Sequence, residues 1–128
     1  MVASREYRIT QGDTRAFLAA AGRLQRMRRR NGARRWALLH DAADPEVWIE
    51  RFETSTWLDY LRVRDRMTVA DRDVEDRILS FHRGEGPPLT RYLLAHVPAS
   101  GHSEEVSDPG AATYDPSLPP ALSAGRLT

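Results

Sequence analysis

The fold of this chain is decided by residues 34–53, which read RRWALLHDAADPEVWIERFE. In an extended chain, residues 34–41 place Trp36 and Leu38 on one face and Ala37 and Leu39 on the other, and residues 47–53 divide in the same way, with Trp48, Glu50 and Phe52 on one face. The residues between them, 42–46, contain an Asp-Pro pair and predict a turn. The stretch therefore predicts a β-hairpin.

Outward from the hairpin, the hydrophobic period predicts helices and two more strands. Before it, apolar residues recur at the spacing of one face of an amphipathic helix: Phe17, Ala20, Ala21, Leu24 and Met27. After it, Thr56 and Thr68 each begin a helix, with an aspartate three residues on at the capping position. The inward face of the second of these helices is expected to carry Val69, Val74, Ile78 and Phe81. Short strands are expected at residues 6–9 and 89–96.

The resulting order, β-α-β-β-α-α-β, is the split β-α-β pattern of a ferredoxin-like sandwich. It predicts an α+β fold in which one four-stranded antiparallel sheet is covered by helices on one face. The other face of the sheet is expected to carry Ala37, Leu39, Ile49, Tyr7 and Tyr92, and such a face is too apolar to remain in water. We therefore expect two copies to pack through it as a homodimer, a dimeric α/β barrel.

The amino-acid composition excludes several catalytic mechanisms. All 19 basic residues are arginine, and the 128 residues include no cysteine. Without lysine there is no Schiff-base mechanism and no P-loop, and without cysteine there is no thiol nucleophile, disulfide or thiolate metal site. Carboxylates, histidines, hydroxyls, arginines and the backbone remain as catalytic groups, unless a cofactor binds.

The chain divides into two parts by composition. Residues 1–97 are expected to form one domain, which is small enough to gain from oligomerisation. Residues 98–128 are dominated by Pro, Gly, Ser and Ala, and this composition predicts a disordered or loosely docked tail. No stretch has the length and apolar character of a signal peptide or a membrane helix, so we expect a cytoplasmic protein without membrane insertion.

Six short segments, read in order, resemble one family. They are RWALL at 35–39, DAADP at 41–45, WLDYL at 57–61, VADR at 69–72, FHRG at 81–84 and Pro87-Pro88. Together they resemble the soluble C-terminal domain of enterobactin-exporter-like major facilitator transporters, a dimeric α/β barrel of the antibiotic-biosynthesis-monooxygenase kind. The resemblance covers about residues 4–96 and includes no membrane helices, so it does not imply transport. Free-standing relatives imply small enzymes: cofactor-free monooxygenases, cyclases and Pictet–Spengler-type condensation enzymes.

Glu50 is the first candidate for acid–base catalysis. In the strand at 47–53 it shares a face with Trp48 and Phe52, and a carboxylate between aromatic rings tends to have a raised pKa and can act as a general acid or base. The alternative is an ion pair with Arg34 or Arg35 across the hairpin.

Glu53 and His40 are the other catalytic candidates. Glu53 could be a second base or the ion-pair partner of Arg91, and His40 could shuttle protons or be hydrogen-bonded in the turn. No two histidines and a carboxylate are spaced as metal ligands within one element, so neither a metal site nor a cofactor is expected.

The predicted substrate-binding residues are aromatic and basic. They are Trp36, Trp48, Phe52, Arg34, Arg35 and Tyr60. The indoles and Phe52 would hold an aromatic ring, either arginine would grip a carboxylate, and Tyr60 would donate a hydrogen bond. The arginines of residues 26–35 are interpreted as a solvated helix end and a strand edge, so no nucleic-acid partner is expected.

These features predict a small-molecule enzyme of bacterial specialised metabolism that uses cofactor-free acid–base chemistry on an aromatic substrate. A Pictet–Spengler-type condensation is favoured, followed by cofactor-free oxygenation. The alternative is a non-catalytic dimerisation or ligand-binding domain, as the resemblance to a transporter domain implies.

Overall fold

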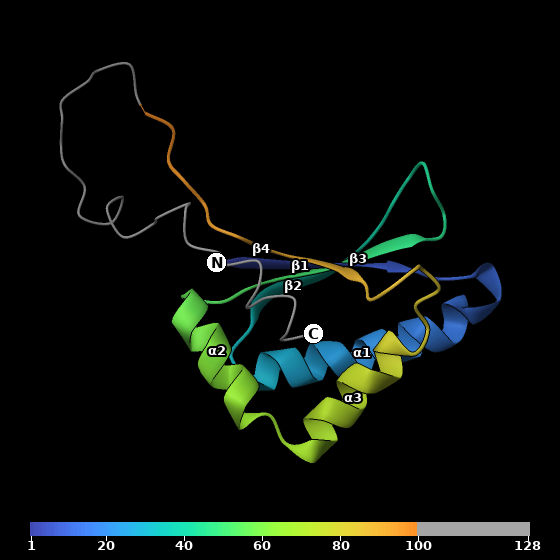
Figure 1. Cartoon of the computed structure of the whole chain (residues 1–128), viewed down its shortest axis with the longest axis horizontal. Coiled ribbons are helices and arrows are strands. Elements are labelled where there is room, and N and C mark those ends of the chain that lie inside the picture. The colour runs from blue at the N-terminus through green and yellow to red at the C-terminus, as the bar shows by residue number, and fades with distance from the viewer. Residues whose placement is uncertain (100–128) are drawn as a thin grey trace.

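A computed structural model describes residues 1–99, shown in Figure 1. The predicted tail, apart from its first two residues, lies outside the described residues. The elements are β1 (Val2–Arg8), η1 (Gln11–Asp13), α1 (Thr14–Arg30), β2 (Arg34–His40), β3 (Val47–Glu53), α2 (Trp57–Arg66), α3 (Val69–Leu79) and β4 (Leu89–Leu93). Their order matches the predicted one, although β1 begins earlier than residue 6 and β4 ends before residue 96.

The strands form one antiparallel sheet in the order β2-β3-β1-β4. All three α-helices lie on the same side of it (Figure 1). The chain therefore has the α+β, ferredoxin-like architecture that its sequence predicts. None of the helices in residues 1–99 combines the length and apolar character needed to cross a bilayer.

The hairpin between β2 and β3 is closed by its own turn residues. The carboxylate oxygen Oδ1 of Asp41 accepts hydrogen bonds from the backbone amides of Ala43 (2.7 Å) and Asp44 (3.0 Å). Such an Asx turn reverses the chain, and the strands then pair with His40 opposite Trp48. At the other end the register shifts beside Arg35, whose φ of 51° lies in the left-handed region.

The helices follow the predicted pattern, with one correction. All five apolar residues predicted for the inner face of α1 are buried. Thr68 and Asp71 form a reciprocal capping box at the start of α3. The prediction that Val69 faces inward is wrong, because it occupies the first turn of α3 beyond the edge of the core and is 78% exposed.

The structure also corrects the prediction of which residues lie on each face of the sheet. Tyr7 pairs with Trp48 and Tyr92 pairs with Ala3, and these residues point to the helix-covered face rather than the open one. Side chains alternate along a strand, so the register decides the face of every residue. Ala37, Leu39 and Ile49 lie on the open face as predicted. Leu89 and Leu93 of β4 lie on the same face, and Leu39, Leu89 and Leu93 are each about half exposed.

Candidate functional site

Five charged side chains are buried between the sheet and the helices. Each comes from a different element: Arg5 from β1, Arg28 from α1, Glu50 from β3, Arg64 from α2 and Glu75 from α3. Charged groups this deep in a protein need partners, because the loss of hydration costs about 5 kcal/mol per ion. We call these five residues the buried charge network.

Glu50 is the most enclosed member, with 0% of its surface exposed. Its Oε2 accepts hydrogen bonds from Nε of Arg28 (3.0 Å) and from the indole Nε1 of Trp36 (2.9 Å). Its Oε1 lies 3.4 Å from Nη2 of Arg28, so the guanidinium binds both oxygens. This two-point contact fixes the orientation of the Arg28 guanidinium against Glu50.

Glu75 joins three arginines. It accepts hydrogen bonds from Nη1 of Arg28 (3.1 Å) and Nη1 of Arg64 (2.6 Å), and Nη1 of Arg5 lies 3.8 Å away. Burial alone would raise the pKa of Glu75, but the positive charges of Arg28, Arg5 and Arg64 and the hydrogen bond from Arg64 outweigh it and lower that pKa. Burial likewise disfavours the charged form of Arg28, but Glu50 and Glu75 raise the pKa of its guanidinium. The partners of Glu75 and Arg28 therefore favour the charged forms of both side chains.

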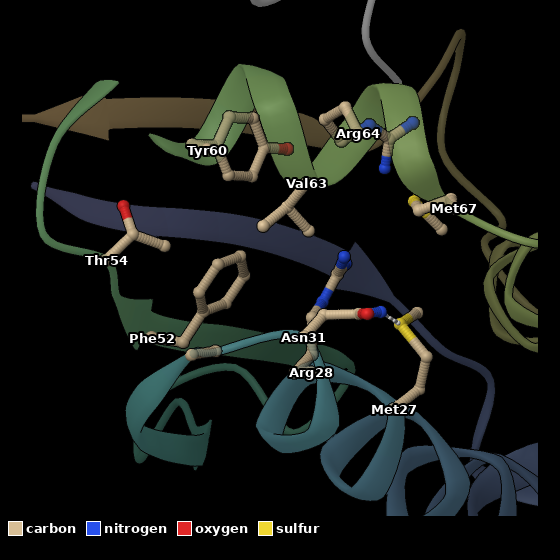
Figure 2. A pocket seen from close by; sticks show the side chains of 10 residues that line it. Met27, Arg28, Asn31, Phe52, Thr54, Tyr60, Val63, Arg64 and Met67 are labelled. Carbon is tan, nitrogen blue, oxygen red and sulfur yellow. Dashed lines mark hydrogen bonds between the residues drawn. The ribbon is translucent and has the colours of Figure 1, made fainter. Parts of the chain in front are cut away.

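A small pocket, with a cavity volume of about 20 Å³, lies next to the network between α1, β3 and α2. Its lining includes Arg28, Phe52, Tyr60, Val63, Arg64 and Met67. Figure 2 shows Phe52 from β3 and Val63 from α2 pointing toward one another, with the Arg28 guanidinium beside them. That guanidinium lies 4.8 Å from the centre of the Phe52 ring. The pocket thus has apolar and aromatic walls and cationic groups on one side.

An aromatic cluster borders the pocket behind Tyr60. The rings of Trp57 and Tyr92 lie 5.6 and 5.1 Å from the Tyr60 ring, centre to centre. The hydroxyls of Tyr60 and Tyr92 are 3.0 Å apart and share a hydrogen bond. Burial and the neighbouring Tyr60 raise the pKa of Tyr92 above its usual range, so this hydroxyl stays protonated.

The structure brings together some of the predicted site residues. Phe52 and Tyr60 line the pocket, and Glu50 lies behind Arg28 without lining it. Trp36 touches the site through its hydrogen bond to Glu50. The partner of Glu50 is thus Arg28 rather than Arg34 or Arg35.

The other predicted residues lie elsewhere. Glu53 is on the open face of the sheet, 3.3 Å from Nε of Arg35, and Arg34 is exposed. The ring of His40 stacks on Trp48 at 3.7 Å, and its Nε2 lies 2.7 Å from the carbonyl oxygen of Pro45, as in the turn alternative. None of these five residues lines the pocket.

Four members of the network are not among the predicted site residues, and a helical period could have found three of them. The prediction that the arginines of residues 26–35 are solvated is wrong for Arg28, which is buried because it lies on the inner face of α1. Arg28 continues the stripe of Phe17, Ala21 and Leu24, and Glu75 lies one turn before Ile78. Arg64 likewise follows Tyr60 by four residues. A charge on the apolar stripe of a helix indicates a buried ion.

Within residues 1–99, no three His, Asp or Glu side chains come close enough together to hold a metal ion. The donors of the site are instead arginines, the hydroxyls of Tyr60 and Tyr92, and the amide of Asn31.

Solved structures with a similar fold include a protein from Bordetella bronchiseptica described as an antibiotic biosynthesis monooxygenase. The two share 12% identity with a TM-score of 0.62 over 75% of this chain and 96% of that one. A similarly described protein from Nitrosomonas europaea shares 18% identity with a TM-score of 0.57 over 73% and 88%. Tetracenomycin F2 cyclase from Streptomyces glaucescens, a polyketide cyclase, shares 15% identity with a TM-score of 0.55 over 78% and 99%. At these identities the comparison establishes the fold.

No curated protein matches the chain significantly. A family model described as transmembrane secretion effector matches residues 1–99, the whole of the described domain. This confirms the resemblance to a transporter-associated domain, here with the fold of the antibiotic biosynthesis monooxygenases. The chain belongs to the transmembrane secretion effector family.

Proposed function

We propose that this domain is a cytoplasmic small-molecule enzyme that takes an aromatic substrate into the pocket beside the buried charge network. The observation that supports the proposal is the composition of that pocket: the rings of Phe52 and Tyr60 form its walls, and the guanidinium groups of Arg28 and Arg64 lie at its side. Pockets of this kind bind planar ligands through the apolar wall and orient them through a few polar groups.

In this proposal the protein's own side chains supply the catalysis. The Tyr60 hydroxyl, held by Tyr92, donates a hydrogen bond to a substrate carbonyl oxygen. Arg28 and Arg64 stabilise negative charge that develops on that oxygen. Glu50 does not line the pocket, so we assign it a positioning role, in which it holds Arg28 and Trp36, in place of direct proton transfer.

The charge of the site favours one reaction over another. A Pictet–Spengler condensation proceeds through an iminium cation, which two neighbouring arginines disfavour, whereas they stabilise an enolate or phenolate. We therefore propose ring closure through an enolate, which forms when an acidic methylene of the substrate loses its proton to water, ahead of the Pictet–Spengler reaction. A cofactor-free oxygenation also begins from such an anion and is the next candidate.

The experiment is a turnover screen with the full chain, analysed by mass spectrometry. The substrates are aromatic polyketones, phenols with dissolved oxygen, and aryl-ethylamines with aldehydes. We expect a ring-closed product that has lost water from the polyketones, whereas oxygenation would add oxygen to the phenols. Failure to convert any of the three classes would contradict the enzymatic proposal.

Two variants give the screen a matched control. Glu50→Gln and Glu53→Gln make the same change on opposite faces of β3, but only Glu50 contacts a pocket residue. We expect Glu50→Gln to lower the rate by about 10²-fold and Glu53→Gln to leave it unchanged. Equal rates in both variants would remove Glu50 from the mechanism.

A non-catalytic ligand-binding domain is the second candidate. It is favoured by the pairing of both predicted carboxylates, Glu50 with Arg28 and Glu53 with Arg35, which leaves neither as a ready base. Saturable binding of an aromatic compound without any turnover would support this function.

Either function fits a homodimer formed through the open face of the sheet. Leu39, Leu89 and Leu93 are each about half exposed on that face. Leu39 lies on the edge strand β2 and the other two leucines lie on the opposite edge strand β4, so exposed apolar side chains occur at both sides of this face and favour association. We expect a dimer in sedimentation equilibrium and a shift toward monomer in Leu39→Asp, whereas a monomeric wild type would contradict the proposal.

A further inference from the structure

We propose that a groove between α1 and α3 is the docking site for an acidic segment of this same chain, residues 103–108, which read SEEVSD. The two helices lie together beneath the sheet (Figure 1). The groove shares no lining residue with the pocket beside the buried charge network, so the proposal does not depend on the proposed function.

The groove is lined by side chains of both helices and has a cavity volume of about 170 Å³. Ala20 of α1 and Val74 of α3 provide apolar surface. Arg23 of α1 and Arg77 of α3 add one guanidinium from each helix. Asp73 is the acidic residue of the lining, and within residues 1–99 no ion pair joins it to either arginine. A groove of this composition fits a segment that carries carboxylates and an apolar side chain.

The arginines of the groove have no carboxylate partner among residues 1–99. The guanidinium of Arg77 lies 4.7 Å from the centre of the Phe81 ring, which is uncharged and leaves the positive charge in place. On α1, Arg26 and Arg29 are exposed like Arg23, and the 17 residues of this helix include no aspartate or glutamate. The exposed side of α1 is therefore basic, and an acidic segment complements it.

Residues 103–108 carry the carboxylates that these arginines lack. Residues 100–128 contain four acidic residues against one arginine, and three of the four lie in this short segment. In an extended conformation Glu104, Val106 and Asp108 would share one face, with an apolar side chain between two carboxylates. The groove offers the complementary pattern, which is apolar surface with an arginine on each helix.

The segment is near enough along the chain to reach the groove. Ten residues, 94–103, separate the end of β4 from Glu104. Ten extended residues span about 33 Å, which is similar to the diameter of a domain of about 100 residues. Because the segment is tethered to the domain, its effective concentration there exceeds that of a second copy in dilute solution. Docking within one chain is therefore favoured over docking between chains.

The test is paramagnetic relaxation enhancement on the full chain. The sequence contains no cysteine, so Ser103→Cys provides a single site for a nitroxide label. The readout is the intensity of the backbone amide signals of isotope-labelled protein. We expect the signals of Ala20 and Val74 to lose intensity severalfold at about 50 mM salt and to recover at about 500 mM, where the screening length is only about 4 Å.

Two double variants, each made in the labelled protein, give a matched control. Arg23→Gln with Arg77→Gln removes both arginines of the groove, whereas Arg62→Gln with Arg66→Gln removes two exposed arginines of α2. Both change the net charge of the protein by the same amount. We expect the first double variant to restore the signals of the groove and the second to leave their loss unchanged.

An absence of signal loss in α1 and α3 at low salt would overturn the inference. Equal recovery in the two double variants would also overturn it, because overall charge would then explain the contact. A mixture of nitroxide-labelled and isotope-labelled molecules detects contact between copies, and an equal signal loss there would contradict docking within one chain. If the groove variant does not fold, Glu104→Gln with Glu105→Gln replaces it, and unchanged signal loss in that variant would overturn the inference.

Discussion

The helix-covered face of the sheet has two halves that are held in different ways. One half is apolar, with Tyr7, Phe17, Leu24, Ile78 and Phe81 in close contact. The other contains the buried charge network, the pocket and the smaller cluster around Phe52 and Tyr60. The first half gains stability from the burial of apolar surface, and the second depends on the pairing of charges.

Two helices show the contrast. Helix α1 runs beneath the sheet (Figure 1). Leu24 of this helix lies in the apolar core, and Arg28, one turn later, binds Glu50. Helix α2 buries only Tyr60 and Arg64. The packing of α2 against the sheet therefore depends on the polar and aromatic contacts of these two side chains. The fold and the site are therefore stabilised by separable sets of residues.

The largest expected effect is in the charged half. Glu50→Gln keeps the shape of the side chain but leaves Arg28 with one partner fewer in the interior, and we expect a loss of about 4 kcal/mol in the free energy of unfolding. Glu53→Gln, at an exposed pair with Arg35, is expected to cost less than about 0.5 kcal/mol. Urea denaturation measures the free energy of unfolding of both variants. Similar losses in the two would contradict the distinction between the buried and the surface ion pair.

A slightly smaller effect is expected in the apolar half. Leu24 is completely buried, and Leu24→Ala leaves a cavity that costs about 3 kcal/mol. Because the pocket lies in the other half, we expect ligand affinity to be unchanged under conditions where the variant is folded. A large loss of affinity would show that the two halves are coupled.

Low pH is expected to destabilise the fold through the charged half. The folded-state pKa of Glu75 lies below its ordinary value of 4.5, so its ionised form stabilises the fold. That contribution is fully present above about pH 4.5 and is lost as the pH falls through the lowered folded-state pKa. Thermal unfolding from pH 7 to pH 2.5 should show a Tm that falls below pH 4.5, with a shallower slope in Glu75→Gln. Identical slopes would exclude Glu75 as the source.

The smallest effect concerns the border of the pocket. Tyr60→Phe removes the hydrogen bond to Tyr92 and keeps the ring in place, so we expect a loss of about 1 kcal/mol. Thr68→Ala, which removes the cap of α3, is expected to cost a similar amount and is the control for catalysis. Turnover should fall in Tyr60→Phe alone, and an equal decrease in both variants would remove Tyr60 from the proposed mechanism.

Much of the fold could be predicted from the sequence because its signals are local. The alternation in residues 34–53 places Glu50 with Trp48 and Phe52 on one face and Glu53 on the other, as the strand pairing confirms. The faces of Tyr7 and Tyr92 could not be predicted, because they depend on the register with β3 and with β1. Local alternation sets two faces in each strand, but only pairing decides which of them meets the helices.

The candidate site shows the same division. Phe52, Tyr60 and Glu50 could be found from their positions in elements, whereas the arginine predicted to act with them comes from the wrong segment. Arg34 and Arg35 lie close to Glu50 in the sequence, but Arg28 reaches it from α1, which packs across the sheet. An ion pair between two elements depends on how they pack, and the separation of two residues in the sequence does not predict that packing.

By itself, the sequence determined the order and type of the elements, the ferredoxin-like class and the absence of lysine and cysteine chemistry. Each of these follows from residue type or from short-range periodicity. The packing of the elements, and not the sequence pattern, brings five charges from five elements together under the helices, with Nη1 of Arg5 lacking a hydrogen-bond partner among the described residues. This cluster arises from the packing of the elements, because a buried charge is stabilised by a partner that the fold brings into contact with it.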